Sequence, residues 1–164
     1  MKAKDLMIPL EEYLTPDTTL REAVSLLQNA ARGEGRVGVK GLPVLDTSGR
    51  PIGMVSMHDA LKAVCPPYLS LMHLGHFTWD GMVEDLARKA GTRKVGELMS
   101  RNVVTVSENE PLMGCIDLML AKRIKRLPVV DAAGKVVGML YERDIFFAIA
   151  KAMLEPRSSP GGGK

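Results

Sequence analysis

Apolar side chains recur along the chain at spacings that predict two amphipathic helices. In two stretches the apolar residues stand three or four positions apart, which places them on one face of a helix. The stretches contain Leu20, Ala23, Val24 and Leu27, and Leu112, Cys115, Ile116, Met119 and Leu120. Pro111 stands near the start of the second helix, where proline is tolerated, and Ser107 is a plausible N-cap.

Each predicted helix lies between a short strand and a hairpin. The short strands are expected at Tyr13 to Thr15 and at Val103 to Val106. One hairpin joins "LPVL" to "RPIGMV" through "DTSG", and the other joins "LPVV" to "KVVGML" through "DAAG". Both turns have Asp first and Gly last, as type I turns prefer. A further helix is expected to begin near Asp59 after the first hairpin and near Asp144 after the second.

These elements form two copies of one unit. Residues 40–59 and 125–144 align at an offset of 85, with nine of twenty positions identical. Residues 5–27 and 97–119 align at an offset of 92. The seven extra residues of the first copy fall within the Gly-rich stretch "ARGEGRVGVK", so we expect a loop there.

The pattern predicts an α/β (α+β) protein made of two β-α-β-β-α repeats. A unit of about fifty residues buries little surface alone, so the two sheets are expected to pack together around a shared core. We assign residues 1–64 to the first repeat and 95–154 to the second. Residues 65–94 form a connector with a short helix that ends at Gly91, and residues 155–164 form a disordered tail.

Composition is that of an ordinary globular protein and excludes several function classes. The chain has 164 residues, of which 46% are hydrophobic and 4% aromatic, and its net charge is +3. Nucleic-acid-binding proteins usually have a clustered basic surface, which so small a net charge does not indicate, so we do not expect nucleic acid as a partner. No signal peptide and no membrane-spanning stretch is expected. Cys65 and Cys115 lack the spacing of a metal or disulfide motif, which favours reduced thiols and a cytoplasmic location.

With both repeats aligned, the chain resembles a tandem pair of cystathionine-beta-synthase (CBS) domains, a Bateman-type module. The residues that carry the resemblance are "LMS", "VVTV", "RLPVVD", Gly134, "VVGML" and Asp144 in the second copy. In the first copy they are "LM", "LTPDTTLREA", "GLPVLD", Gly49 and "IGMVSMHD". The resemblance covers nearly all of residues 5–154, apart from the connector and the insertion.

The resemblance implies pseudo-two-fold symmetry and two clefts that bind AMP, ADP, ATP or S-adenosylmethionine, with no required cofactor. The ribose is expected at Asp59 and Asp144, which close "GMVSMHD" and "GMLYERD". Ser56 keeps the hydroxyl of the family pattern, whereas Tyr141 departs from it. The other expected ligand-binding residues are Met54, His58, Val104, Ile124, Lys125, Arg126, Lys40 and Met139. Since two cations and Ser56 face the Asp59 cleft, we expect it to bind more tightly.

Simpler interpretations of the same residues stay open. Asp59 and Asp144 could cap helices, and Lys125 and Arg126 could belong to a solvated face. His73 and His76 lack a third ligand for a metal. His58 has no nucleophile or oxyanion arrangement beside it, so no enzyme is expected.

Two functions are therefore expected from different classes. One is a regulatory nucleotide sensor that acts on an unidentified partner protein in trans. The alternative is a ligand-free dimerisation scaffold with vestigial clefts. The wide apolar surface of "IFFAIAKAML" favours a homodimer in either case.

Overall fold

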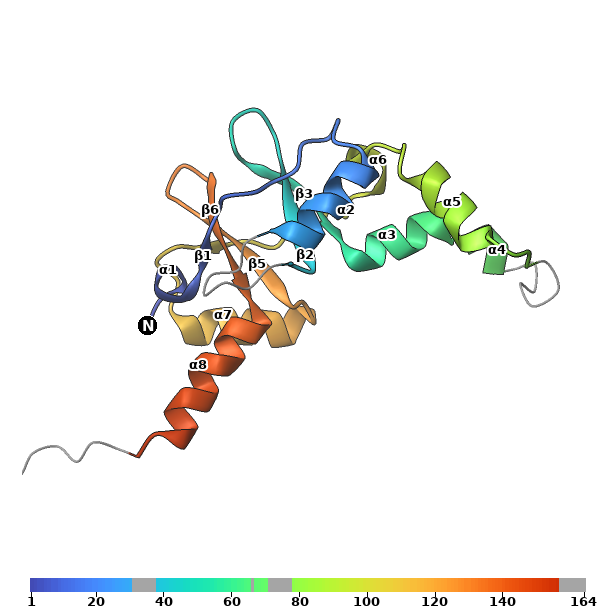
Figure 1. Cartoon of the computed structure of the whole chain (residues 1–164). Coiled ribbons are helices and arrows are strands. Elements are labelled where there is room, and N and C mark those ends of the chain that lie inside the picture. Colours follow the sequence, from blue (N-terminus) through green and yellow to red (C-terminus); the bar gives the residue numbers. More distant parts are fainter. Residues whose placement is uncertain (31–37, 66, 71–77, 157–164) are drawn as a thin grey trace, which may run out of the picture.

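The structure is a computed structural model that describes residues 1–30, 38–65, 67–70 and 78–156 (Figure 1). The elements of the first repeat are α1 (Ala3–Leu6), β1 (Ile8–Pro9), α2 (Leu20–Asn29), β2 (Gly41–Leu45), β3 (Pro51–Ser56) and α3 (Met57–Val64). The connector contains α4 (Pro67–Ser70) and α5 (Met82–Ala90). The second repeat contains α6 (Val95–Leu98), β4 (Val106–Ser107), α7 (Leu112–Lys122), β5 (Arg126–Val130), β6 (Val136–Tyr141) and α8 (Glu142–Leu154). The predicted mixed α/β class is confirmed.

Both predicted amphipathic helices form, but their N-caps differ. Thr19 caps α2, because its hydroxyl accepts from the Glu22 amide at 3.3 Å while the Glu22 carboxylate accepts from the Thr19 amide at 2.9 Å. The N-cap of α7 is Pro111, so the prediction of Ser107 was wrong. Ser107 lies in β4, and its hydroxyl accepts from the Asn109 amide instead.

Both predicted hairpins form, and the same aspartate–glycine turn closes each. The Asp46 carboxylate accepts from the Ser48 and Arg50 amides at 2.9 and 3.0 Å. The Asp131 carboxylate accepts from the corresponding Ala133 and Lys135 amides at the same distances. Gly49 and Gly134 have φ of 82° and 81°, a backbone conformation that favours glycine.

The strands that precede the helices are shorter than expected. Of Tyr13 to Thr15, only Leu14 pairs, with Val44 in a parallel bridge. In the second copy the strand is Val106–Ser107, parallel to β5, rather than Val103 to Val106. The remaining residues of both stretches stay outside the hairpin ladders, and Val104 among them lines a cavity.

The start of each repeat packs on the hairpin of the other repeat. β1 pairs with β6 and extends the second repeat's sheet to the order β1-β6-β5-β4, while β2 and β3 form a separate two-stranded sheet. Reciprocally, Ser100 after α6 pairs with Met54 of β3 through two backbone hydrogen bonds of 2.9 Å. Two close contacts repeat this relation, since Met99 lies against Gly53 and Met7 lies against Gly138.

Backbone hydrogen bonds obey the same pseudo-two-fold relation. The Ala3 amide donates to Glu110 O, and the Val95 amide donates to Thr18 O, both at 2.8 Å. All four residues are related by the offset of 92 seen in the sequence. The exchanged segments therefore hold the repeats together in two equivalent places.

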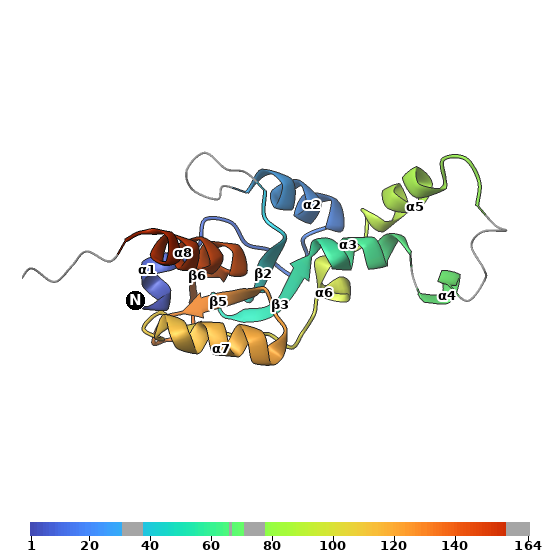
Figure 2. The same cartoon turned by 90° about the horizontal axis from the view of Figure 1, so that it is seen from below.

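The core is shared between the repeats. One buried cluster contains Leu14, Leu27, Val44 and Val55 of the first repeat together with Met139 and Tyr141 of the second. The other contains Leu127, Val129 and Leu140 with Ala3 from the N-terminal segment. Figure 2 shows α2 and α7 on opposite sides of the hairpins, with α8 leading away toward the C-terminus.

The connector packs against α3 through its own helix. As predicted, α5 ends at Ala90 with Gly91 as its C-cap. Ala90 is buried in a small cluster with Leu20 of α2 and Ala63 of α3, so α5 packs on the helices of the first repeat (Figure 1). His73 and His76, most of the Gly-rich insertion and most of the predicted tail lie outside the described residues.

The exchange of segments leads to a prediction about two related glycines. A Cβ at Gly138 would lie 2.8 Å from the Ile8 carbonyl oxygen as well as against Met7, whereas a Cβ at Gly53 would meet only the Met99 side chain among its nearest atoms. We expect Gly138→Ala to lower the free energy of unfolding by about 1–3 kcal/mol, because backbone must move. Gly53→Ala is the matched control and should cost less. Urea unfolding that ranked Gly53→Ala as the more harmful change would contradict this account.

Candidate functional site

A cavity of about 750 Å³ lies between the two repeats and gathers most of the predicted site residues. Its walls come from the end of β3 and the start of α3, from the segment after α6, and from the turn between α7 and β5. The lining residues are Met54, Ser56, His58, Asp59, Ser100, Arg101, Asn102, Val104, Arg123, Ile124, Lys125, Arg126 and Pro128. Ligand pockets commonly have volumes of roughly 300–1,000 Å³, so this cavity can hold a nucleotide.

Asp59 is fixed at the first turn of α3. Its Oδ2 accepts from the Ser56 amide at 2.8 Å and from the Ser56 hydroxyl at 3.0 Å, and the side chain is only 9% exposed. Ser56 is the N-cap and Asp59 the third helical residue, so the capping interpretation holds in the form of a capping box. The box holds the carboxylate rigidly at the cavity wall, where it can accept hydrogen bonds from ligand hydroxyls.

Arg126 reaches the cavity from the start of β5 and is half-buried. Its side chain covers Gly41, where a Cβ would lie 2.8 Å from the Arg126 Cδ atom, so a side chain at position 41 would displace the arginine. Burial lowers the pKa of the Arg126 guanidinium, and the charges of Tyr141 and Asp59 oppose this shift. Its Nε is buried and has no hydrogen-bond partner among the described residues, so a ligand anion could supply an acceptor.

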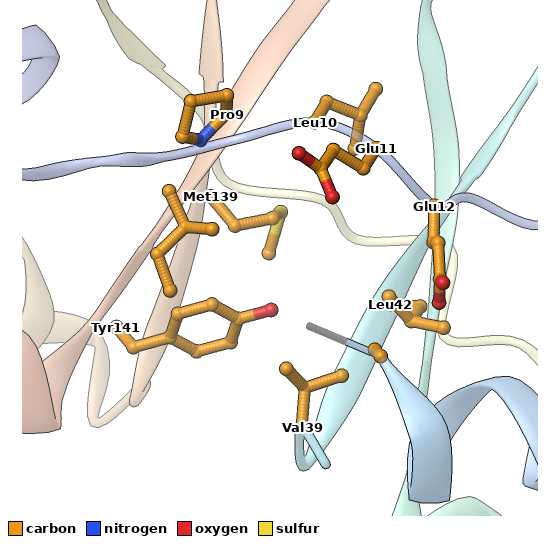
Figure 3. A pocket seen from close by; sticks show the side chains of 10 residues that line it. Pro9, Leu10, Glu11, Glu12, Val39, Leu42, Met139 and Tyr141 are labelled. Carbon is orange, nitrogen blue, oxygen red and sulfur yellow. The ribbon is translucent and has the colours of Figure 1, made fainter. Parts of the chain in front are cut away.

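The second cleft, related by pseudo-symmetry, contains two small cavities of about 30 and 90 Å³. The smaller is lined by Ile8, Pro9, Leu10, Glu11, Glu12, Ala30, Val39, Leu42, Met139 and Tyr141. The larger is lined by Val39, Lys40, Lys125, Arg126, Tyr141, Glu142 and Arg143. Tyr141 reaches from β6 toward Val39 and Leu42, and its hydroxyl donates to Gly41 O at 3.3 Å (Figure 3). Its ring therefore occupies space that lies open at Ser56.

Three exchanges of residue type explain why the two clefts differ. Tyr141 stands where the first copy has Ser56. At the offset of 92, Glu12 corresponds to Val104 and Pro9 corresponds to Arg101. The second cleft thus has a carboxylate where the first cleft has an apolar residue, and an apolar residue where the first cleft has a cation, and both exchanges make these two positions less favourable to an anion.

The structure unites eight of the twelve predicted residues in the large cavity: Met54, Ser56, His58, Asp59, Val104, Ile124, Lys125 and Arg126. Lys40, Met139 and Tyr141 lie at the second cleft, whereas Asp144 is not among the residues lining either of its two cavities. The sequence prediction missed Ser100, Arg101, Asn102, Arg123 and Pro128. The motif "LMS" directly precedes Arg101 and was the sequence signal nearest to it. The motif does not show, however, that the exchange of segments brings Arg101 to the cavity that Asp59 lines.

Two absences concern residues 1–30, 38–65, 67–70 and 78–156. Within those ranges, no helix is both long and apolar enough to cross a membrane. In the same part of the chain, no three His, Cys, Asp or Glu side chains are grouped so that they could hold a metal ion.

The shared core, the paired hairpins and the inter-repeat cavity define a module of two repeats, and its family follows from comparison with known proteins. Residues 3–65 and 95–151 match the CBS domain, so the chain belongs to the CBS domain family and contains a tandem pair. A CBS domain-containing protein of Dictyostelium discoideum is 29% identical, with 93% of each chain covered. The chain spans 66% of chloroplastic CBSX2 of Arabidopsis thaliana (29% identical) and 23% of an inosine-5'-monophosphate dehydrogenase of Methanocaldococcus jannaschii (27% identical).

Solved structures show the same fold. The crystal structure of CBSX2 in complex with AMP superposes with a TM-score of 0.64 at 28% sequence identity, covering 93% of this chain and 98% of that chain. A relative with this fold therefore binds an adenine nucleotide.

The capping box at Ser56 has a counterpart outside the cavity, which allows a matched stability test. Ser56 and Thr19 cap their helices with the same reciprocal bonds. We expect Ser56→Ala and Thr19→Ala each to lower the free energy of unfolding by about 1 kcal/mol. Urea unfolding of the ligand-free protein measures both. A loss confined to Thr19→Ala would mean that the Ser56–Asp59 pair does not stabilise α3.

Proposed function

We propose that this chain is a regulatory module that binds an adenine nucleotide in the Asp59 cavity and acts on a partner protein in trans. The observation that carries the proposal is the combination, in one cavity of about 750 Å³, of a rigid carboxylate, apolar walls and cationic side chains. These three kinds of group match the ribose, the base and the phosphate of a nucleotide. The module is proposed to be regulatory rather than enzymatic, and to work in the cytoplasm.

Each part of the nucleotide has a complementary wall. Asp59 accepts from the ribose hydroxyls, and the adenine ring lies against Met54, Val104 and Ile124. Lys125 and Arg126 contact the phosphate, with Arg126 supplying a planar fork of donors. The AMP complex of CBSX2 supports this ligand class.

Regulation follows from where the cavity lies. Its walls belong to both repeats, so a bound nucleotide bridges β3 and α3 to the turn before β5. A ligand shifts a conformational equilibrium only when its affinity differs between two states. A state in which the repeats are farther apart would bind the nucleotide with a different affinity, so binding favours one separation of the repeats. Because α3 packs against α5, a movement of α3 at the cavity reaches the connector.

Nucleotide-dependent stability tests the proposal. A ligand at about 100 times its dissociation constant stabilises a protein by about 2.7 kcal/mol. At roughly 2–4 °C per kcal/mol for this size, the melting temperature should rise by about 5–10 °C with AMP, ADP, ATP or S-adenosylmethionine. No shift with any of the four would favour the ligand-free scaffold instead.

Substitutions at the two aspartates test which cleft binds. In calorimetry, Asp59→Ala should weaken nucleotide binding by tenfold or more, whereas Asp144→Ala should have a smaller effect because Tyr141 fills that cleft. Thr19→Ala is the control, since it loses a similar helix cap away from the cavity and should bind normally. A larger effect of Asp144→Ala would reverse the assignment.

A homodimer is the proposed assembly. Along α8, Phe146, Met153 and Leu154 are 61%, 78% and 83% exposed, an unusually apolar surface for a helix that projects from the body (Figure 1). Light scattering at micromolar concentration should give twice the chain mass, and Phe146→Glu should weaken the dimer. Met113→Glu, at a residue of α7 that is 72% exposed, is the control and should not. A monomer mass for the unaltered protein would rule the dimer out.

A further inference from the structure

The Asp59 cavity carries more positive charge than one phosphate group requires. Four basic side chains line it, namely Arg101, Arg123, Lys125 and Arg126, and Asp59 is the one carboxylate among the lining residues. Lys125 and Arg126 already account for the phosphate of a mononucleotide. Arg101 and Arg123 therefore remain to be explained.

Arg101 is held in place by its own repeat. One terminal nitrogen of its guanidinium donates to the Gly96 carbonyl of α6 at 3.1 Å. A guanidinium has five N–H donors, so this single bond orients the fork and leaves it with further donors. The exchange of segments that pairs Ser100 with Met54 also brings the next residue, Arg101, to the wall of the cavity between the repeats.

Arg123 occupies a backbone conformation that disfavours arginine. It ends α7 with φ of 54° and ψ of 43°, and among the described residues it is the one non-glycine residue with positive φ. Glycine or asparagine is usual at such a helix end, because other side chains are strained there. An arginine at this place is explained if its side chain is used in the cavity that it lines.

We propose that the Asp59 cavity selects a nucleoside polyphosphate, and that Arg101 and Arg123 are the specificity-determining residues for the phosphates beyond the first. This inference rests on the proposed nucleotide-binding function and names the ligand class within it. Each added phosphate brings negative charge toward the two arginines. S-Adenosylmethionine is disfavoured, because its sulfonium and ammonium groups would face four cations.

The experiment is calorimetry of the full chain with ATP, ADP, AMP and S-adenosylmethionine, with a chelator present so that divalent cations do not mask the phosphates. We expect ATP to bind at least about tenfold more tightly than AMP, which corresponds to one additional charge-assisted contact. S-Adenosylmethionine should bind most weakly. Raising the salt concentration should weaken ATP binding more than AMP binding, since exposed charges are screened.

Two variants separate a role in binding from a role in the fold. Arg101→Gln and Arg123→Gly should each weaken ATP binding by about tenfold while changing AMP binding by less than about twofold. Arg123→Gly should also raise the melting temperature of the ligand-free protein, because glycine adopts positive φ without strain. Lys122→Gln is the control, since it removes a neighbouring exposed charge that does not line the cavity, and ATP binding should persist.

The outcomes that overturn the proposal are distinct from failure of the nucleotide site itself. Equal affinities for AMP and ATP, or equal losses for both in the variants, would refute polyphosphate selection while leaving the nucleotide site intact. An effect of Lys122→Gln as large as that of Arg123→Gly would refute it too, because general charge would then be responsible. If none of the four ligands bound, the proposed function would fail together with this inference.

Discussion

The structure depends on the reciprocal exchange of the segments that start each repeat. Neither hairpin has a complete set of partners within its own repeat, and a unit of about fifty residues buries little surface by itself. β1 supplies the missing edge of β6, and the segment after α6 supplies two hydrogen bonds to β3. Gly53 and Gly138 admit these segments closely, because a side chain at either place would collide with Met99 or Met7.

The same exchange builds the site. It carries Arg101 and Val104 of the second repeat to the first repeat's Asp59, and it carries Pro9 and Glu12 to the corresponding place in the other cleft. One symmetric scaffold therefore receives chemically different residues at its two clefts. The first cleft holds one large cavity, whereas the second holds two small ones, with Tyr141 lining both and Glu11 and Glu12 lining the smaller.

Groups that stabilise the fold also line the first cleft. The Ser56–Asp59 capping box stabilises the start of α3 and also presents the carboxylate to the cavity. Arg126 packs over Gly41, and its Nε is buried without a hydrogen-bond partner in the described part of the chain. An anion that satisfied this donor would remove an unfavourable feature of the ligand-free state, which couples ligand binding to the packing of the repeats.

The sequence by itself determined the repeat, its two helices and two hairpins, and the resemblance that names the family. These features depend on local periodicity and on turn residues such as Asp46 and Gly49, which act over a few positions. It also singled out eight residues that meet in one cavity, because the family pattern links them. Only the tertiary structure decided the lengths of the short strands, the cap of α7, the exchange of segments, and the presence of Arg101 and Arg123 in the same cavity as Asp59. Those features depend on contacts between residues far apart in the chain, and no local pattern states which hairpin a segment will join.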